Sequence, residues 1–371
     1  MRVLQLGKFY PIRGGVEKVM YDLLNGLAQH EVDCDMLCAH GEKGSREVNL
    51  SPHSRIICTR TLFKKYATMI SPQMILTLRR IAPTYDIIHV HHPDPMAAMA
   101  LWCSGYKGHV VLHWHSDILK QKHLLRLYAP LQQWLIRRAD TIIGTTQCYI
   151  DHSPLLQPHL EKCTVLPIGI DPIAPDPIGA ERLRNRYGGR KIIFSLGRLV
   201  HYKGYRYLIE AATHLPDNYV VLIGGSGNLM QELQQQIADS HLEEKVYLIG
   251  RIHDEELAAY YTACDLYCLS SRQKTEAFAI VQIEAMSCGK PVVSTKIPGS
   301  GVSWVNADGV SGLVVNIEDG AALASAIRRI MDNPELYHQL SEGAHNRYKQ
   351  LFTKEKMVDR CLEIYDKLLK S

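Results

Sequence analysis

The stretch KIIFSLGRLVHYKG, residues 191–204, decides the fold of this chain. Lys191–Leu196 is a short run of β-branched and apolar residues, which is typical of a buried strand. The loop after it is polar, and apolar residues then recur at helical spacing from Tyr207 to Ala212. A strand, a loop and a helix in this order are the repeating unit of a parallel sheet covered on both faces.

The same unit repeats along all 371 residues, so we predict the α/β class with two doubly wound, Rossmann-like domains. The expected strands are Val3–Leu6, Asp33–Cys38, Arg55–Cys58, Asp86–Val90, His109–His113, Thr141–Gly144 and Thr164–Leu166, then Lys191–Leu196, Tyr219–Ile223, Lys245–Ile249, Asp265–Leu269, Pro291–Ser294 and Gly312–Val315.

The boundary between the domains is predicted from composition. Leu166–Pro177 contains four prolines and is the best linker candidate. We predict an N-terminal domain at 1–170, a C-terminal domain at 171–352 and a terminal helix at 353–371. The helix is expected because apolar residues recur at intervals of three and four, and it could pack back on the N-terminal domain.

The composition, 46% hydrophobic and 22% charged, is that of an ordinary globular protein. The longest uninterrupted apolar run, Met96–Cys103, has eight residues, against roughly 18 for a membrane-spanning helix. The first residues lack the pattern of a secretory signal, so we expect a cytoplasmic protein whose ten cysteines are thiols.

Positive charge is concentrated in the first half. Residues 1–172 hold 19 lysines and arginines against 14 acidic residues, whereas residues 173–371 hold 23 against 24. This asymmetry suggests an anionic surface or partner. Neither half has the dense basic cluster with interleaved aromatics of a nucleic-acid binder, so we expect no nucleic acid.

Residues 60–82 and 119–138 combine basic and apolar side chains, as helices in a membrane interface do. We expect these two segments to hold the protein peripherally on the anionic inner face of the cytoplasmic membrane. The alternative is that the apolar faces pack on the sheet and the charges are solvated. The basic residues are Arg60, Lys64, Lys65, Arg79 and Arg80, then Lys120, Lys122, Arg126, Arg137 and Arg138.

Gly14-Gly15-Val16-Glu17 follows the first expected strand and opens a helical pattern. Two glycines at a helix start let backbone N–H groups approach an anion, which the helix dipole also favours. The alternative is a flexible loop that ends in a helix cap. The spacing differs from G-x-G-x-x-G, and no acid follows the second strand, so a dinucleotide dehydrogenase is disfavoured.

Arg198 and Lys203 stand five apart in the loop after the strand Lys191–Leu196. Ligands of open parallel sheets bind beyond the carboxyl ends of the strands. An arginine and a lysine there could converge on a diphosphate. Taken alone, such a pair is more often a solvated loop.

Glu276 and Glu284 would be separated by about 12 Å along the axis if the segment 276–286 were helical. They could not then be a double-displacement pair, which needs carboxylates about 5 to 5.5 Å apart. They could hold the two ends of an elongated ligand such as a nucleotide sugar. The alternative is a capped helix with Glu276 at its positive end and Glu284 solvated.

His113 and His115 share one face of an expected strand, as do His89 and His91 in the strand before it. Four histidines on neighbouring strands would permit a metal site, but no acidic or cysteine ligand accompanies them. We expect satisfied polar groups at strand ends and no metal.

In combination these motifs resemble the retaining GT-B glycosyltransferases of family 4 over nearly the whole chain. They are Gly-Gly-Val-Glu, a strand-end histidine, Gly-Arg-(x)4-Lys-Gly at 197–204, Gly-Gly-Ser-Gly at 224–227, and Glu-(x)7-Glu at 276–284. The stretch IPGSGVSWVN at 297–306 looks like the subgroup that builds bacterial O-antigen polysaccharide, in which mannosyltransferases using GDP-mannose are common.

The resemblance implies two Rossmann-like domains facing each other across a cleft, an N-terminal acceptor domain and a C-terminal donor domain. Arg198 and Lys203 would hold the donor diphosphate and stabilise its charge. His115 and Glu276 would contact the donor sugar, and Glu284 the nucleotide ribose. The implied catalytic residues are His115, Glu276, Arg198 and Lys203, and the other implied donor-binding residues are Gly14, Gly15, Gly227, Phe278, Ala279, Ile280 and Glu284.

The chain departs from the family at Glu276-Ala277-Phe278-Ala279, where Glu-Gly-Phe-Gly is common. A backbone with positive φ would be costly for alanine. We expect these residues to start a right-handed helix, for which alanine serves equally well.

The resulting functional expectation is a retaining transfer of a hexose, mannose from GDP-mannose above all, to a polyprenyl-diphosphate-linked saccharide. The nucleotide sugar is a substrate, and we expect no cofactor. Two alternatives stay open: a sugar-nucleotide epimerase on the same fold, and a partner subunit that binds a sugar nucleotide without turnover.

Overall fold

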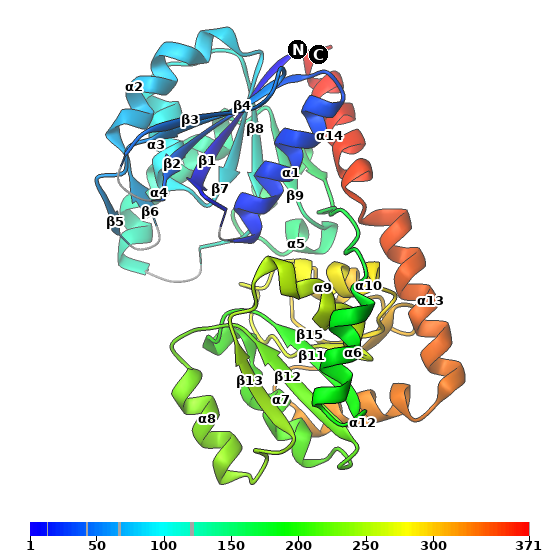
Figure 1. The fold of residues 1–371 in the computed structure, drawn as a ribbon. Helices are drawn as coiled ribbons and strands as arrows, with labels where there is room; N and C mark the ends of the chain where they lie inside the picture. The colour runs from blue at the N-terminus through cyan, green and yellow to red at the C-terminus, as the bar shows by residue number, and fades with distance from the viewer. Residues whose placement is uncertain (13, 42–43, 66–67, 119–121, 371) are drawn as a thin grey trace. The chain divides into compact units, whose positions relative to one another are not determined.

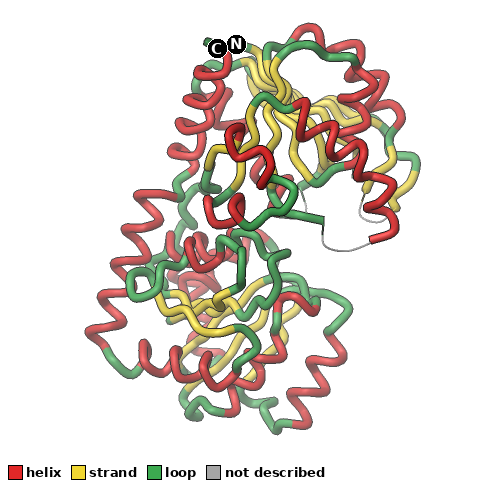
Figure 2. Tube along the Cα trace, turned by 180° about the vertical axis from the view of Figure 1, so that it is seen from behind, coloured by secondary structure: helices red, strands yellow, loops and turns green. Residues whose placement is uncertain are grey.

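A computed structural model describes the chain apart from residues 13, 42–43, 66–67, 119–121 and 371. The chain forms two compact units, which we call unit 1 (Met1–Gly169 with Lys354–Ser371) and unit 2 (Ile170–Thr353). Each unit has a sheet with helices on its faces, which can be followed in Figure 1 by chain position and in Figure 2 by element type.

Unit 1 is built on an eight-stranded sheet, parallel except for one edge pair. From edge to edge its strands are β10 (Cys163–Val165), β9 (Thr141–Gly144), β8 (His109–Trp114), β7 (Ile87–His92), β1 (Arg2–Tyr10), β2 (Asp33–His40), β4 (Ser54–Thr59) and β3 (Arg46–Ser51). Its helices are α1 (Gly15–Gln29), α2 (Pro72–Ile81), α3 (Pro95–Ser104), α4 (Lys122–Arg138), α5 (Gln147–Asp151) and α14 (Lys354–Leu369), with 3-10 turns at Ala82–Thr84 and Gln157–Lys162.

Helix α14 packs against α1 although the two lie at opposite ends of the chain (Figure 1). The contact depends on Gly26, because a Cβ atom there would lie 2.3 Å from Cγ2 of Val358. The small residue thus lets the last helix approach the first, and one buried face of α14 completes the core of unit 1.

Unit 2 has a six-stranded sheet in which all neighbours are parallel. Its strands, from edge to edge, are β13 (Val246–Gly250), β12 (Tyr219–Gly224), β11 (Lys191–Leu196), β14 (Leu266–Leu269), β15 (Val292–Lys296) and β16 (Gly312–Asn316). Its helices are α6 (Pro177–Arg186), α7 (Tyr205–Thr213), α8 (Met230–Asp239), α9 (Asp254–Ala263), α10 (Ile280–Ser287), α11 (Val302–Val305), α12 (Gly320–Met331) and α13 (Pro334–Leu351), with a 3-10 turn at His201–Lys203.

The chain passes between the units after Gly169 and again after Thr353. The Ile170 N–H donates to the Phe352 carbonyl at 2.9 Å, and the Tyr348 hydroxyl donates to the Ile170 carbonyl at 2.9 Å. The two connecting segments are therefore fixed side by side on unit 2.

Every expected strand is present within a few residues of its predicted bounds. However, the prediction missed one strand, β3, and was wrong about residues 60–82. Strand β3 was not expected, because its residues are polar and largely exposed at the sheet edge, so they lack an apolar run. Residues 60–82 do not form one amphipathic helix. They form an antiparallel hairpin of β5 (Phe63–Lys65) and β6 (Thr68–Ile70), followed by α2.

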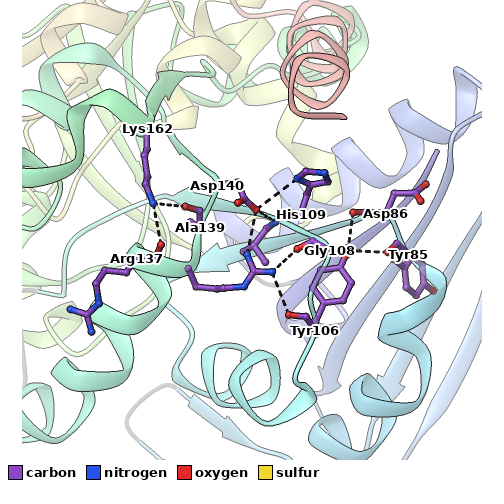
Figure 3. Close-up of polar contacts among 11 residues, drawn as sticks. Tyr85, Asp86, Tyr106, Gly108, His109, Arg137, Ala139, Asp140 and Lys162 are labelled. Carbon is purple, nitrogen blue, oxygen red and sulfur yellow. Dashed lines mark hydrogen bonds and ion pairs between the residues drawn. The ribbon is translucent and has the colours of Figure 1, made fainter. Parts of the chain in front are cut away.

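Polar contacts tie the end of α4 to the start of β8 (Figure 3). The Arg138 guanidinium donates to the Gly108 carbonyl at 2.5 Å and lies 3.4 Å from Asp140. Lys162 Nζ donates to the Ala139 carbonyl at 3.0 Å and so satisfies an end of the helix. Arg138, one of the basic residues of the membrane prediction, thus connects the end of α4 to the loop before β8.

The membrane prediction also falls partly on Tyr66, Leu119 and Lys120, which lie outside the described residues, as do the side chains of Lys65 and Lys122. None of the described helices is long and apolar enough to cross a bilayer.

Candidate active site

The loop after β11 is held at the carboxyl edge of the unit 2 sheet by the loop after β12. The Leu199 N–H donates to the Ser226 carbonyl at 2.9 Å. Gly227 lies so close that a Cβ atom there would sit 2.2 Å from the Leu199 carbonyl oxygen. Glycine is therefore required at 227 for the two loops to pack, and this packing fixes the segment that carries Arg198.

The side chains of Arg198 and Lys203 both lie near the aromatic ring of Tyr202. The Arg198 guanidinium donates to the Tyr202 hydroxyl at 3.1 Å, and its Cζ lies 5.9 Å from the Tyr202 ring centroid. Lys203 Nζ lies 5.7 Å from the same centroid. Arg198 is exposed and Lys203 is buried, so the pair presents one exposed and one buried cation at this edge.

Lys203 forms a buried ion pair with Glu276, in which Nζ lies 2.5 Å from Oε2. The Ser271 hydroxyl donates to the same carboxylate oxygen at 2.9 Å. Burial lowers the pKa of Lys203, but the Glu276 carboxylate more than offsets this, and the pKa ends above its usual range. The structure thus brings together two residues from separate sequence motifs, with the lysine held as a cation.

The segment 276–279 is not helical, so the expected helix start is wrong. Ala279 adopts φ 64° and ψ 79°, the left-handed region, and α10 begins only at Ile280. This conformation costs alanine about 1 kcal/mol relative to glycine. The turn is held by hydrogen bonds from the Gly301 N–H to the Ala277 carbonyl and from the Ser300 hydroxyl to the Glu276 carbonyl. The helical separation expected for the two glutamates therefore does not apply.

Glu284 lies on α10, and it is half-buried rather than solvated. The Tyr261 hydroxyl donates to its Oε2 at 2.7 Å. Burial and the neighbouring Glu284 carboxylate both raise the pKa of Tyr261. Phe278 is buried against Phe352, with ring centroids 5.8 Å apart, and so contributes to the core.

In unit 1, Gly14 caps the N-terminus of α1 with extended backbone, and Gly15 is the first residue of that helix. A Cβ atom at Gly14 would meet Oε2 of Glu17 at 2.6 Å. Burial raises the pKa of Glu17, against the opposing effect of Lys8 and of backbone N–H groups of Glu17 and Gly14. The helix start expected to face an anion therefore faces a carboxylate of its own first turn.

His115 directly follows β8 and belongs to a stack of buried histidines in unit 1. Ring centroids are 4.0 Å apart for His113 and His115, and 4.6 Å apart for His89 and His91. Burial lowers the pKa of His113 to about 3. Neither nitrogen of His113 has a hydrogen-bond partner among the described residues, so the expectation of satisfied polar groups is wrong for this residue.

Nitrogen atoms of His89, His91 and His113 lie within 4.8 Å of one another. However, the rings of His89 and His91 are 12° from parallel, and those of His89 and His113 are 21° from parallel. Imidazole lone pairs lie in the ring plane, so stacked rings direct them side by side rather than at one metal ion. The absence of a bound metal stays a prediction.

Among the predicted site residues, unit 2 brings Arg198, Lys203 and Glu276 together, while unit 1 carries Gly14, Gly15 and His115. Tyr202 and Ser271, which contact these residues, were not among the predicted site residues. Tyr202 stood in the quoted loop, and its place between two cations was a usable signal. Ser271 gave none, because a serine after a strand is common in any loop.

Two family models match this chain. Residues 181–347 match glycosyl transferases group 1, and residues 13–173 match glycosyltransferase family 4. The chain is 31% identical to O-antigen chain mannosyltransferase C of Escherichia coli, with 100% of both chains covered. It is also 31% identical to D-rhamnosyltransferase WbpZ of Pseudomonas aeruginosa, over 95% of this chain and 92% of the relative.

Solved structures match the fold. Sucrose-phosphate synthase of Thermosynechococcus elongatus has a TM-score of 0.79 at 20% identity, with 100% of both chains covered. HepE of Anabaena, solved in complex with UDP, has a TM-score of 0.79 at 22% identity and covers 99% of this chain and 100% of its own. Both predictions, of the GT-B fold with two Rossmann-like domains and of the family, are confirmed. The chain belongs to glycosyltransferase family 4 and is a glycosyltransferase.

Proposed function

We propose that the protein is a retaining hexosyltransferase that moves mannose from GDP-mannose to a polyprenyl-diphosphate-linked saccharide in O-antigen synthesis. The observation that carries the proposal is the buried Lys203–Glu276 ion pair, with Arg198 beside it, at the carboxyl edge of the unit 2 sheet. Parallel sheets bind ligands at this edge, and two cations there suit a nucleotide diphosphate.

Each charged side chain then has a role in the transfer. Arg198 and Lys203 bind the donor diphosphate and stabilise the charge it gains as the glycosidic bond breaks. Glu276, held by Lys203 and Ser271, accepts hydrogen bonds from hydroxyls of the donor sugar. Glu284 binds the ribose, and His115 meets the transferred sugar.

The reaction balances without a cofactor. The bond between the anomeric carbon and the β-phosphate oxygen breaks, and the acceptor hydroxyl oxygen bonds to the same carbon on the face the diphosphate leaves. The hydroxyl proton passes to the departing diphosphate. Attack on this face retains the anomeric configuration of the donor.

The choice of mannose rests on the relatives. The Escherichia coli relative is named a mannosyltransferase, and a relative from Mycolicibacterium smegmatis, 34% identical over 46% of this chain and 47% of its own length, is named GDP-mannose-dependent. The Pseudomonas aeruginosa relative is named a D-rhamnosyltransferase. D-rhamnose is mannose without its 6-hydroxyl, so a GDP-rhamnose donor is the second candidate.

A donor screen followed by product analysis tests the proposal. The thermal unfolding of the protein is measured with GDP-mannose, GDP-D-rhamnose, UDP-glucose and ADP-glucose, since a bound ligand raises the unfolding temperature. The best donor is then incubated with and without a polyprenyl-diphosphate saccharide. We expect GDP-mannose to stabilise most and to give a longer saccharide only with the acceptor. A changed sugar nucleotide without acceptor would indicate an epimerase, and binding without product would indicate a non-catalytic subunit.

We also propose that unit 1 docks peripherally on an anionic membrane at its cytoplasmic face. Large apolar side chains on β5, before it, and on α2, α3 and α4 are more than half exposed: Leu62 54%, Phe63 54%, Leu76 71%, Trp102 55% and Leu127 80%. Helix α3 packs against α2, α4 and β6, the hairpin partner of β5, so these elements are contiguous in unit 1. The exposed cations Lys64, Arg79, Arg80 and Arg126 lie on the same elements.

A further inference from the structure

Five polar side chains lie on one face of the unit 1 sheet, inside its core: Gln5, His89, His91, His113 and His115. The first four are 0% exposed and His115 is 6% exposed. The strand register explains their alignment, because Gln5 pairs with His89 and His91 pairs with His113. A buried polar stripe is costly unless its members are hydrogen-bonded, so its partners matter.

Four of these residues and Tyr365 of α14 form a continuous chain of hydrogen bonds. Nε2 of His115 lies 2.8 Å from Nδ1 of His91, and Nε2 of His91 lies 2.6 Å from Oε1 of Gln5. Gln5 Nε2 donates to the Tyr365 hydroxyl at 3.2 Å. The Tyr365 hydroxyl lies 2.5 Å from Nδ1 of His89. These hydrogen bonds thereby connect α14 to His115 along one face of the unit 1 sheet.

The three histidine rings that these hydrogen bonds join are neutral, because burial lowers the pKa of His89, His91 and His115 well below the usual value. A neutral imidazole has one N–H and one lone pair. Each ring that donates through one nitrogen must therefore accept through the other. Fixing the proton of one ring fixes the tautomers of its neighbours.

The orientation of the Gln5 side-chain amide determines which residue donates and which accepts in each of these hydrogen bonds. Its NH2 group lies 3.2 Å from the Tyr365 oxygen and 3.9 Å from Sγ of Cys34, so both N–H groups have acceptors. Turned over, the amide would have one N–H for the lone pair of His91 and, among the described residues, no acceptor for the second. With the amide as it stands, His91 donates from Nε2 to Gln5 and accepts at Nδ1 from Nε2–H of His115.

We propose that Gln5 and Tyr365 are positioning residues that hold His115 in one tautomer, protonated on Nε2 and with its lone pair on Nδ1. The inference rests on the proposed function in taking His115 as the residue that meets the donor sugar. In this tautomer Nδ1 accepts a hydrogen bond from a sugar hydroxyl and cannot donate one. His115 thus holds the sugar at a hydroxyl without itself adding a charge.

The test measures the tautomer directly. Nitrogen-15 NMR of the full-length protein without donor distinguishes protonated from unprotonated ring nitrogens, and His115→Gln identifies the His115 signals. Tyr365→Phe removes only the hydroxyl, and Gln5→Met removes the amide at similar length. In the wild type we expect one tautomer with Nε2–H. In both variants we expect a mixture of two tautomers, and kcat about tenfold lower with the donor KM within about twofold.

Val358→Ala is the matched control, because it loosens the packing of α14 on Gly26 without touching the hydrogen-bond chain. It should lower the unfolding temperature but keep the single tautomer and the kcat. An unchanged tautomer in Tyr365→Phe and Gln5→Met overturns the inference, and so does a mixed tautomer with unchanged kcat. If the wild type transfers no sugar at all, the proposed function fails, while the NMR result still decides whether Gln5 and Tyr365 set the tautomer.

Discussion

Nζ of Lys203 lies 2.5 Å from Oε2 of Glu276, and both residues are only 8% exposed. A buried ion pair contributes little net stability, but loss of one partner leaves an unpaired buried charge. The pair therefore ties the loop after β11 to the turn before α10, so that a cation and a carboxylate stand in fixed positions at one sheet edge.

Arg198→Ala should reduce kcat by about two to three orders of magnitude, because it removes a charge that stabilises the leaving diphosphate. The fold should be unchanged, since Arg198 is exposed. Arg206→Ala is the matched control: Arg206 is also exposed and lies 5.4 Å from the Tyr207 ring centroid, as Arg198 does near Tyr202. Steady-state kinetics measure kcat, and circular dichroism checks that each variant is folded. A near-normal kcat in Arg198→Ala would show that Arg198 does not stabilise the leaving diphosphate.

Ala279→Gly should raise the free energy of unfolding by about 0.5–1 kcal/mol, because glycine adopts positive φ without steric cost. In contrast, Ala326→Gly in the interior of α12 should lower it by about 1 kcal/mol. Urea unfolding of both variants provides the comparison. Destabilisation by both glycines would mean that Ala279 is not strained.

Stability should fall steeply as the pH drops below about 6.5, the usual pKa of histidine. Burial lowers the pKa of His92 and His113 to about 3, so the unfolded chain binds more protons than the folded chain between these values. In this range each ring lowers the free energy of unfolding by about 1.4 kcal/mol for each pH unit by which the pH falls. Unfolding by urea at pH 7.5 and pH 5.5 tests this, and equal free energies at both would contradict it.

His113→Leu should weaken this pH dependence and raise the free energy of unfolding at pH 7.5 by about 1–2 kcal/mol, since neither ring nitrogen has a partner in the part of the chain that the structure describes. His91→Leu, which breaks two hydrogen bonds, should instead lower it. The same urea experiment measures both variants. If His113→Leu is the more destabilising of the two, His113 has a partner or role that the structure does not reveal.

At low ionic strength the protein should co-sediment with anionic liposomes, and high salt should release it, because each basic residue near the surface contributes about 1 kcal/mol. Leu76→Ser and Leu127→Ser should weaken binding. Ile178→Ser, which alters a side chain 72% exposed in unit 2, should not. Binding that is absent, resists salt or weakens equally in all three variants would contradict membrane docking by unit 1.

The strands were predictable because buried parallel strands are short apolar runs, as at Ile192–Phe194, whatever surrounds them. The site loops were predictable in position, since glycines and cations follow those strands. The turn at Ala279 was not, because alanine by itself favours a right-handed helix and only the surrounding hydrogen bonds enforce positive φ.

The hydrogen bond from Gln5 to Tyr365 joins residues 360 positions apart. No local pattern encodes it: a glutamine in an apolar strand and a tyrosine on an amphipathic helix are each ordinary. Folding brings them together because α14 packs on the face of the sheet that carries the histidines. The charged residues that the structure brings together at the unit 2 sheet edge could therefore be proposed from sequence motifs, whereas Gln5 and Tyr365 could not.

The most direct test of the account is calorimetric titration of GDP and GMP into the wild type, Arg198→Ala and the control Arg206→Ala. If Arg198 and Lys203 hold the diphosphate, the wild type and Arg206→Ala should bind GDP about tenfold or more tightly than GMP. Most of that preference should be lost in Arg198→Ala. An equal preference for GDP in all three proteins would contradict the assignment of this sheet edge as the diphosphate site.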